Sequence, residues 1–213
     1  MAFTPSVISK QQKYTITPAK NNNDFNDSST CRSSRVSHRS KYYVNGGILD
    51  TRENRNVEFK AAQGKYIYDI LPSTVERYGC AFANGEGGML YLGIKDDGVI
   101  TGVRVSSKDE EHILRTIQRT FDKFLPRPPS HSVRLIPLCS LNMARVFPNY
   151  KVVEISVRGG TLSDIFETGD HKVFIKRDGS IELQNALQIK DLAITKYKQM
   201  LEQRGTATKT VSS

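Results

Sequence analysis

The chain has 213 residues, a formal net charge of +9 and 38% hydrophobic residues, enough for one domain of ordinary size with part of the chain left unpacked. No apolar run has the length of a membrane span, and the N-terminus lacks the apolar core of a signal peptide. The basic balance favours polyanionic partners such as nucleic acid or an acidic membrane surface. These properties predict a soluble protein of the cytoplasm or nucleus that has no membrane partner.

Residues 1–45 differ in composition from the rest of the chain. They are rich in Ser, Asn, Lys and Thr, and their apolar residues follow no period, which is typical of a disordered tail. Seven Lys and Arg residues against two Asp residues give this segment +5 of the total charge. Two interpretations stay open: an electrostatic arm for nucleic acid, or a plain solvated tail. We expect a folded domain over residues 46–203 and a second disordered tail over 204–213.

The first half of this domain begins with a short strand over residues 56–60. A helix over 71–84 follows, and its apolar stripe at helical spacing consists of Leu71, Val75, Tyr78 and Phe82. Glycines 85, 87 and 88 then stop the helix and form a tight turn. The apolar run 89–94 has the length of a strand. Asp97 and Gly98 form a hairpin turn typical of an antiparallel pair, with the return strand over 99–103.

The second half begins with a helix at Ser107, where Glu110 completes a capping box. Its buried face carries Ile113, Ile117, Phe121 and Phe124. Strands are expected over 132–138, 152–157 and 172–177, with a turn at 178–179. The last helix covers 186–203, with Ile189, Leu192 and Ala193 facing inward. Adjacent strands and packed helices indicate an α+β fold with a mixed or antiparallel sheet.

Glu58 and Lys60 are the most informative pair of charged residues. On a strand they point to the same face, where a carboxylate can hold a divalent metal and a lysine can stabilise charge on a phosphate. Glu53 reaches that face only if the chain bends or bulges between them. Asp96 ends the central strand and is a third acidic candidate, whereas Asp97 belongs to the turn. Taken alone, a Glu-x-Lys pair on a strand is more usually an exposed salt bridge.

Three stretches of this sequence together resemble the core domain of the Schlafen family, also called the Schlafen AlbA-like domain. They are Glu53-x4-Glu58-Phe59-Lys60, then Cys80-Ala81-Phe82-Ala83-Asn84-x2-Gly87-Gly88-x3-Leu92-Gly93-Ile94-x-Asp96, and finally Val173-Phe174-Ile175-Lys176-Arg177-Asp178-Gly179-Ser180. The resemblance spans roughly residues 47 to 200. It is strongest to short members of the family that lack a helicase region.

The resemblance implies a metal-dependent endoribonuclease that acts on tRNA, rRNA or small-RNA precursors. It places Glu53, Glu58 and Asp96 as ligands of Mg²⁺ or Mn²⁺, with Lys60 beside them. Lys176 and Arg177 would line the same groove or be solvated strand charges. Larger family members pair two such lobes, so the resemblance implies that this chain acts as a homodimer or with related Schlafen-like subunits.

Neither a disulfide framework nor a structural zinc site is expected. The three cysteines, Cys31, Cys80 and Cys139, are widely spaced, no CxxC pair exists, and His131 has no second ligand beside it.

Two other functions fit the same fold. The first is a non-catalytic RNA-binding or assembly subunit. The second is a divergent ATP-binding module, which the sequence supports less, because it holds no GxxxxGK[ST] and its glycine-rich stretch follows a helix rather than a strand.

Overall fold

The computed structural model describes residues 41–177 and 179–210, and the predicted N-terminal tail lies outside them up to residue 40. The described strands and helices are, in chain order, β1 (Tyr43–Val44), β2 (Val57–Lys60), α1 (Tyr66–Asp69), α2 (Leu71–Asn84), β3 (Gly87–Leu92), β4 (Val103–Arg104), α3 (Ser107–Phe121), β5 (His131–Cys139), β6 (Val146–Arg158), β7 (Phe174–Arg177), β8 (Ser180–Leu183) and α4 (Ala186–Thr210).

The main sheet is mixed, as expected. Its strand order is β1-β5-β6-β3-β2, and β4 pairs with β6 beyond the end of β3. β2 and β3 are parallel, joined by a crossover through α1 and α2, whereas β6 is antiparallel to both β3 and β5. Because β2 is at the edge of the sheet, one side of its backbone has no neighbouring strand among the described residues. The fold is α+β, with helices packed against a mixed sheet.

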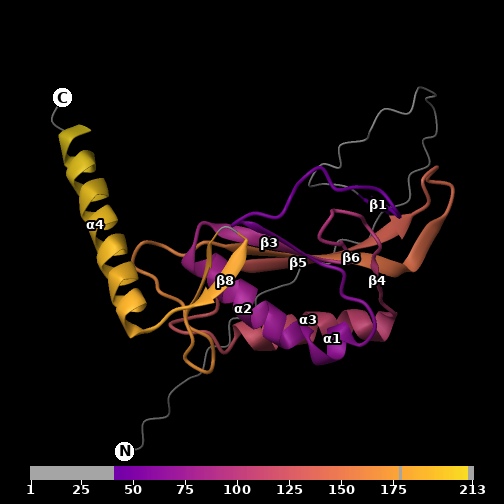
Figure 1. The fold of residues 1–213 in the computed structure, drawn as a ribbon, viewed down its shortest axis with the longest axis horizontal. Helices are drawn as coiled ribbons and strands as arrows, with labels where there is room; N and C mark the ends of the chain where they lie inside the picture. The colour runs from indigo at the N-terminus through magenta and orange to yellow at the C-terminus, as the bar shows by residue number, and fades with distance from the viewer. Residues whose placement is uncertain (1–40, 178, 211–213) are drawn as a thin grey trace, which may run out of the picture. The chain divides into compact units, whose positions relative to one another are not determined.

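Two hydrophobic cores lie on opposite faces of this sheet. The larger core packs α2 and α3 onto one face, as Figure 1 shows for the helices below the strands, and it includes Phe82, Leu92, Ile117, Phe121 and Ile155. The smaller core lies on the other face, under the segments around β1 and β4, and includes Tyr43, Phe59, Tyr91, Ile100 and Ile136. Each strand alternates between the two cores, which fixes the face on which every polar residue of the sheet lies.

A separate two-stranded hairpin of β7 and β8 packs against α2. Asn84, the last residue of α2, joins this helix to the segments around Phe166 and Phe174 through side-chain hydrogen bonds. Its side-chain NH₂ donates to the carbonyls of Phe166 (2.8 Å) and Phe174 (3.2 Å), and its carbonyl accepts from the N–H of Phe166 (2.7 Å). A buried amide with all of these bonds made holds the C-terminal segments in one register against α2.

The predicted helices over 71–84 and from Ser107 are confirmed as α2 and α3, except at one cap, whereas the short helix α1 was not predicted. The expected helix 71–84 is α2, and Ile113, Ile117 and Phe121 are buried on α3. The capping box of α3, however, starts one residue earlier than predicted. Ser106 is the N-cap, and Asp109 rather than Glu110 bonds back to it. Glu110 is instead paired with Lys151 of β6.

Gly87 and Gly88 begin β3 instead of forming the predicted turn after the helix. Gly87 has φ +91°, and a Cβ there would lie 2.8 Å from the backbone of Gly159. A Cβ on Gly88 would lie 2.3 Å from the ring of Phe82. These glycines therefore allow α2 and the 159–160 segment to approach the sheet closely.

Several element boundaries differ from the predicted ones. The expected strand 99–103 is reduced to isolated bridges and the two residues of β4, because the chain there turns over the smaller core. β1 and β8 were not expected, and Tyr43 of β1 is buried within the segment assigned to the tail. α4 continues to Thr210, past the expected end at residue 203, and Ala193 is exposed rather than inward-facing.

Among the described residues, no helix combines the length and the apolar character that crossing a membrane would require.

Candidate functional site

β2 carries the first part of the candidate site. Its alternation directs Glu58 and Lys60 towards α2 and the larger core, while Val57 and Phe59 face the smaller core. The predicted side-by-side placement of Glu58 and Lys60 is therefore confirmed. Unlike an exposed salt bridge, Glu58 is only 4% exposed.

The carboxylate of Glu58 accepts three side-chain hydrogen bonds. The Tyr78 hydroxyl donates to Oε1 at 2.5 Å, the ammonium group of Lys60 donates to the same oxygen, and that of Lys176 donates to Oε2. Lys176 also donates to the backbone carbonyl of Val57 at 2.9 Å. We call Glu58, Lys60, Tyr78 and Lys176 the Glu58 cluster.

Three separate elements assemble the Glu58 cluster. Tyr78 lies on α2, one helical turn before Phe82, so its ring belongs to the face that packs on the sheet. β7 alternates in the same way, and Phe174 and Lys176 both point inward. Both ammonium groups also lie over the Tyr78 ring, with Nζ of Lys60 at 5.2 Å and Nζ of Lys176 at 5.6 Å from its centroid.

Glu58 and Lys60 keep their charges at neutral pH. Burial alone would raise the pKa of Glu58, but the hydrogen bonds from Lys176, Lys60 and Tyr78 outweigh it, and the pKa of Glu58 falls below its ordinary value. Burial opposes the charge on Lys60, but the bond to Glu58 raises the pKa of Lys60 to about 12. Burial and the same carboxylate raise the pKa of Tyr78 to about 12. One carboxylate thus faces two ammonium groups, which leaves the cluster with a net positive charge.

The Glu53 side chain is hydrogen-bonded to the backbone of the edge strand β2. The chain does bend before β2, as the prediction required, because Asn54 and Val57 exchange backbone hydrogen bonds of 3.1 and 3.3 Å. The Glu53 carboxylate accepts the N–H of Phe59 at 2.8 Å. It therefore satisfies a donor on the unpaired side of β2, whereas the side chains that bond the Glu58 carboxylate are those of Lys60, Tyr78 and Lys176.

Asp96 lies on an exposed turn. The N–H of Gly98 donates to the carbonyl of Lys95 at 2.8 Å, and the Asp97 carboxylate accepts the N–H of Val99 at 3.0 Å, so Asp97 has the structural role expected of it. Asp96 lines a shallow hollow of about 470 Å³ together with Ala61, Gln63, Lys95 and Asp97. Neither Glu53 nor Glu58 lines this hollow.

The arrangement does not fit the metal centre that the resemblance implies. Within residues 41–177 and 179–210, no group of three or more His, Cys, Asp or Glu side chains is placed to hold a metal ion. Both oxygens of Glu58 are engaged by protein cations, Glu53 is bonded to the backbone, and Asp96 is on a separate turn. No chemical step through a divalent metal follows from these positions.

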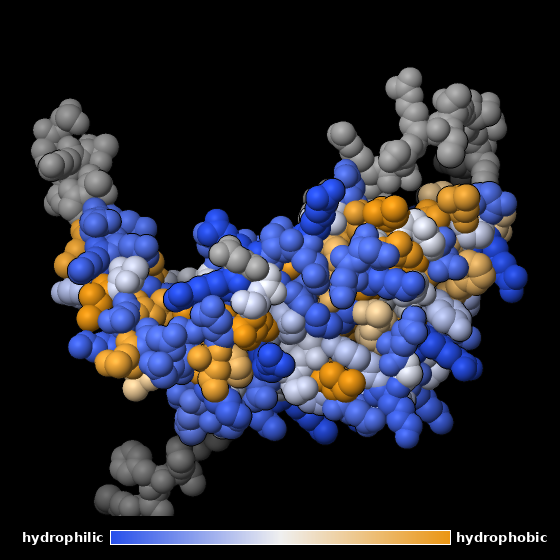
Figure 2. Space-filling model, viewed as in Figure 1, coloured by the Kyte–Doolittle hydropathy of each residue, from blue (hydrophilic) through white to orange (hydrophobic). Residues whose placement is uncertain are grey.

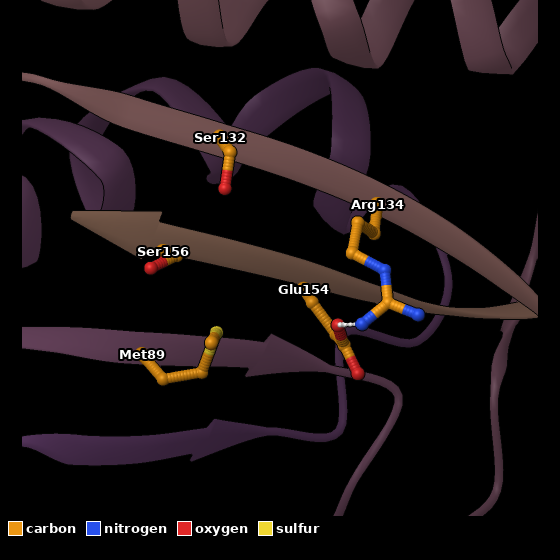
Figure 3. Close-up of a pocket in the computed structure, with 5 residues that line it drawn as sticks. All are labelled: Met89, Ser132, Arg134, Glu154 and Ser156. Carbon is orange, nitrogen blue, oxygen red and sulfur yellow. Dashed lines mark hydrogen bonds and ion pairs between the residues drawn. The ribbon is translucent and has the colours of Figure 1, made fainter. Parts of the chain in front are cut away.

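A second polar site, not anticipated from the sequence, lies on the opposite face of the sheet (Figure 3). We call it the Glu154 hollow, a depression of about 380 Å³ lined by Met89, Ser132, Arg134, Glu154 and Ser156. The carboxylate of Glu154 is buried and accepts from the Tyr43 hydroxyl at 2.5 Å and from Arg134 at 3.1 Å. Burial, with the nearby Glu154, raises the pKa of Tyr91 to about 12.

Sequence comparison assigns the chain to a family. A family model described as Schlafen, AlbA_2 matches residues 53–185, more than half of the chain. The chain belongs to the Schlafen AlbA_2 family. The matched span includes the whole Glu58 cluster and the Glu154 side chain, and this family membership indicates a function related to nucleic acid.

Among solved structures, the Schlafen AlbA_2 chain is similar to the DIP2311 protein from Corynebacterium diphtheriae, with a TM-score of 0.42 and 18% sequence identity. The match covers 67% of this chain and 28% of the bacterial one.

Proposed function

We propose that this domain binds RNA and that the Glu58 cluster contacts the RNA backbone through Lys60. Membership of the Schlafen AlbA_2 family supports a nucleic-acid partner. The observation that carries the proposal is the charge of the cluster, in which two ammonium groups share one carboxylate. The side chain of Lys60 is 29% exposed, whereas that of Lys176 is 1% exposed, so Lys60 is the ammonium group open to a ligand.

The bonding pattern allows Lys60 to change partners at low cost. When its ammonium group turns towards a phosphate, the Glu58 carboxylate keeps its bonds to Lys176 and Tyr78. Glu58 therefore does not become an unpaired buried charge, which is the usual penalty for breaking such a contact. The Glu58 carboxylate and the Tyr78 ring hold the Lys60 ammonium group in one position, where it can contact the phosphate groups of a polyanion.

The proposal is tested by the anisotropy of a fluorescent tRNA titrated with the full chain over a series of salt concentrations. Lys60→Gln should weaken binding about fivefold and reduce the salt slope by about one, as expected for one lost phosphate contact. Arg104→Gln is the matched control, because it removes one exposed positive charge from β4, a strand that pairs with β6 and not with β2. Equal losses for the two variants would mean that only total charge matters and would reject the assigned contact.

RNA cleavage is the second candidate function. It is supported by the meeting of a carboxylate, a hydroxyl and an exposed ammonium group at Glu58, Tyr78 and Lys60. Such groups can position a phosphodiester and transfer protons. The lowered pKa of Glu58 makes it a weak base, which places this candidate behind RNA binding.

Cleavage is measured on the same tRNA in Mg²⁺, in Mn²⁺ and in EDTA, with Glu58→Gln, Glu53→Gln and Asp96→Asn beside the unmodified chain. Metal-dependent cleavage lost in all three variants would support a site in which the acids converge when metal and RNA bind. Cleavage in EDTA that is lost only in Glu58→Gln would support the Glu58 cluster alone. RNA binding with no cleavage in any condition would leave the domain as a binding subunit.

A further inference from the structure

The two edges of the main sheet differ in how their outward backbone groups are bonded. At the β2 edge, side chains of the same chain bond to them: the N–H of Phe59 donates to Glu53, and the carbonyl of Val57 accepts from Lys176. At the opposite side of the sheet, β1 pairs only with the last two residues of β5. The first part of β5 is therefore a second edge, which has no neighbouring strand among the described residues.

The hydrogen-bond pattern of β5 determines which of its backbone groups point to this open side. The N–H of Arg158 donates to the carbonyl of Ser130 at 2.8 Å, so these two residues form a hydrogen-bonded pair. Such pairs recur at every second residue of an antiparallel ladder, which makes Ser132 and Arg134 the next residues of β5 that bond to β6. The residues between and after them direct their N–H and C=O groups to the open side: His131, Val133 and Leu135. We call these three residues the β5 edge.

The position of Pro137 agrees with this direction. A proline has no N–H, so within a sheet it is tolerated where its nitrogen faces an open edge or a bulge. Pro137 is the next outward position after Leu135, and the ladder with β6 becomes irregular directly after it. The open part of β5 therefore ends at Pro137, just before the two residues that β1 covers.

The side chains of β5 differ between the two faces of the sheet. Val133 and Leu135 are partly buried and pack against the larger core, whereas Ser132 and Arg134 are exposed on the other face. The sequence from residue 123 to residue 153 holds five Lys and Arg residues and no Asp or Glu. A strand beside β5 is therefore best matched by apolar side chains on the first face and acidic ones on the second.

The backbone groups of the β5 edge fit a peptide better than a nucleic acid. An extended peptide offers both N–H and C=O groups, so it can bond to the outward carbonyls as well as to the outward N–H groups. The RNA backbone offers negatively charged phosphate acceptors, which leave the outward carbonyls without donors. The half-buried side chains of Val133 and Leu135 also favour apolar partners over phosphates.

We propose that the β5 edge binds an extended peptide segment of another protein, which joins the main sheet as an antiparallel strand and carries alternating apolar and acidic side chains. The apolar side chains lie beside Val133 and Leu135, and an acidic one lies beside Arg134. The antiparallel orientation follows from the more stable ladder that it forms. The proposal concerns the edge of the sheet opposite to β2 and does not depend on RNA binding.

Amide hydrogen exchange of the full chain, followed by NMR, tests whether the edge is open. The N–H groups of Val133 and Leu135 should exchange at least about tenfold faster than those of Ser132 and Arg134, which bond to β6. The probe is a short capped peptide in which valine and glutamate alternate, and it should slow exchange at Val133 and Leu135 about tenfold. Slow exchange there without the probe, or no change with the probe up to about 1 mM, would overturn the proposal.

N-methylation of the probe tests the orientation without changing the protein. In an antiparallel pair, the probe residues opposite Val133 and Leu135 exchange both backbone hydrogen bonds with them, and these probe residues are the valines. N-methyl valines should therefore weaken binding at least about tenfold, whereas N-methyl glutamates should leave it within about twofold, measured by the anisotropy of a labelled probe. Equal affinities would show that no backbone pairing occurs, and a loss with N-methyl glutamates alone would reject the antiparallel orientation.

A proline at the β5 edge tests the same contact from the side of the protein. Val133→Pro removes an outward N–H that the ladder with β6 does not use, and Val133→Ala is the matched control, because it shortens the side chain and keeps the N–H. Val133→Pro should bind the probe at least about fivefold more weakly than Val133→Ala. Equal affinity of the two variants would overturn the proposal. Circular dichroism verifies the fold, and the N-methylated probes keep the test decisive on the unmodified chain.

Two further controls separate the edge from general attraction. A probe with lysine in place of glutamate should bind at least about fivefold more weakly, and equal affinity would reject the acidic partner. Figure 2 shows hydrophobic residues at the end of the molecule that carries the β5–β6 connection, where Leu141 is 82% and Met143 66% exposed. Leu141→Asp should leave probe binding within about twofold. A loss as large as that of Val133→Pro would mean that the probe adheres to this connection, and would overturn the assigned edge.

Discussion

The two faces of the main sheet each carry one buried carboxylate bonded to a tyrosine hydroxyl, and they differ in the number of cations supplied. Glu58 has Tyr78 and two lysines, whereas Glu154 has Tyr43 and one arginine. The first arrangement has a net positive charge and the second is balanced. A buried acid alone therefore does not make a phosphate-binding site, because the surplus of cations around the acid decides whether a phosphate is attracted.

The largest expected effect concerns the stability of the Glu58 cluster. Glu58→Gln should lower the free energy of unfolding by about 3–5 kcal/mol, because Lys176, whose side chain is 1% exposed, is left in the interior without its carboxylate partner. Urea denaturation measures the change. The double variant Glu58→Gln with Lys176→Met should recover much of the loss, since both buried charges are then removed. No recovery in the double variant would mean that packing, rather than charge pairing, dominates at this position.

Removing the hydroxyl of Tyr43 should cost more stability than removing that of Tyr78, because fewer cations remain bonded to the carboxylate. Tyr43→Phe should cost about 2 kcal/mol, because Glu154 is left with Arg134 as its side-chain donor among the bonds described above. Tyr78→Phe should cost about 1 kcal/mol, because two lysines still bond Glu58. The same denaturation experiment compares them. A larger loss of stability for Tyr78→Phe than for Tyr43→Phe would mean that the number of remaining cations does not determine how much each tyrosine contributes.

Substitutions at the Glu58 cluster and at the Glu154 hollow should also differ in their effect on RNA affinity, by about 1 kcal/mol, or roughly fivefold. Lys60→Gln should weaken binding by this amount, while Arg134→Gln should leave it within about twofold, because Arg134 is bonded to Glu154 in the balanced hollow. Anisotropy of the labelled tRNA at one fixed salt concentration is sufficient. If Arg134→Gln has the greater effect, the face of the sheet that carries the Glu154 hollow is the RNA-contacting face.

The smallest effect is the acid dependence of stability. The folded pKa of Glu58 lies below its ordinary value of 4.5, so its contribution is present above that value and is lost as the pH falls through the lower folded pKa. Denaturation between neutral pH and about pH 3 should therefore show a steeper decline for the unmodified chain than for Glu58→Gln. Parallel pH profiles for the two proteins would show that Glu58 is not stabilised in its ionised form.

Local patterns in the sequence predict much of this fold. The apolar stripe and the following glycine set the limits of α2, and strand alternation places Glu58 beside Lys60. The capping box of α3 was assigned one residue too late, because Ser106-Asp109 and Ser107-Glu110 both have the required spacing and only the folded backbone distinguishes them. The strand β8 was missed because its four residues show no strong pattern outside the hairpin.

The contacts of the candidate site are less accessible to such reasoning. Lys176 reaches Glu58 across 118 residues of sequence, and Tyr43 reaches Glu154 across 111. Tyr78 was assigned to an apolar stripe, which is correct for its ring but gives no indication that its hydroxyl bonds a carboxylate. The proposed convergence of Asp96 with the glutamates depends on the path of the turn after β3, which sequence spacing does not determine.

The late arrival of Lys176 has a consequence for synthesis on the ribosome. Glu58, Lys60 and Tyr78 emerge before β7, and until β7 is translated the acid lacks the donor that covers Oε2. The nascent domain must therefore keep this region hydrated until the C-terminal hairpin docks. Chains cut short before residue 176 would carry an uncovered acid in their interior, a defect that quality-control proteases can recognise through local opening.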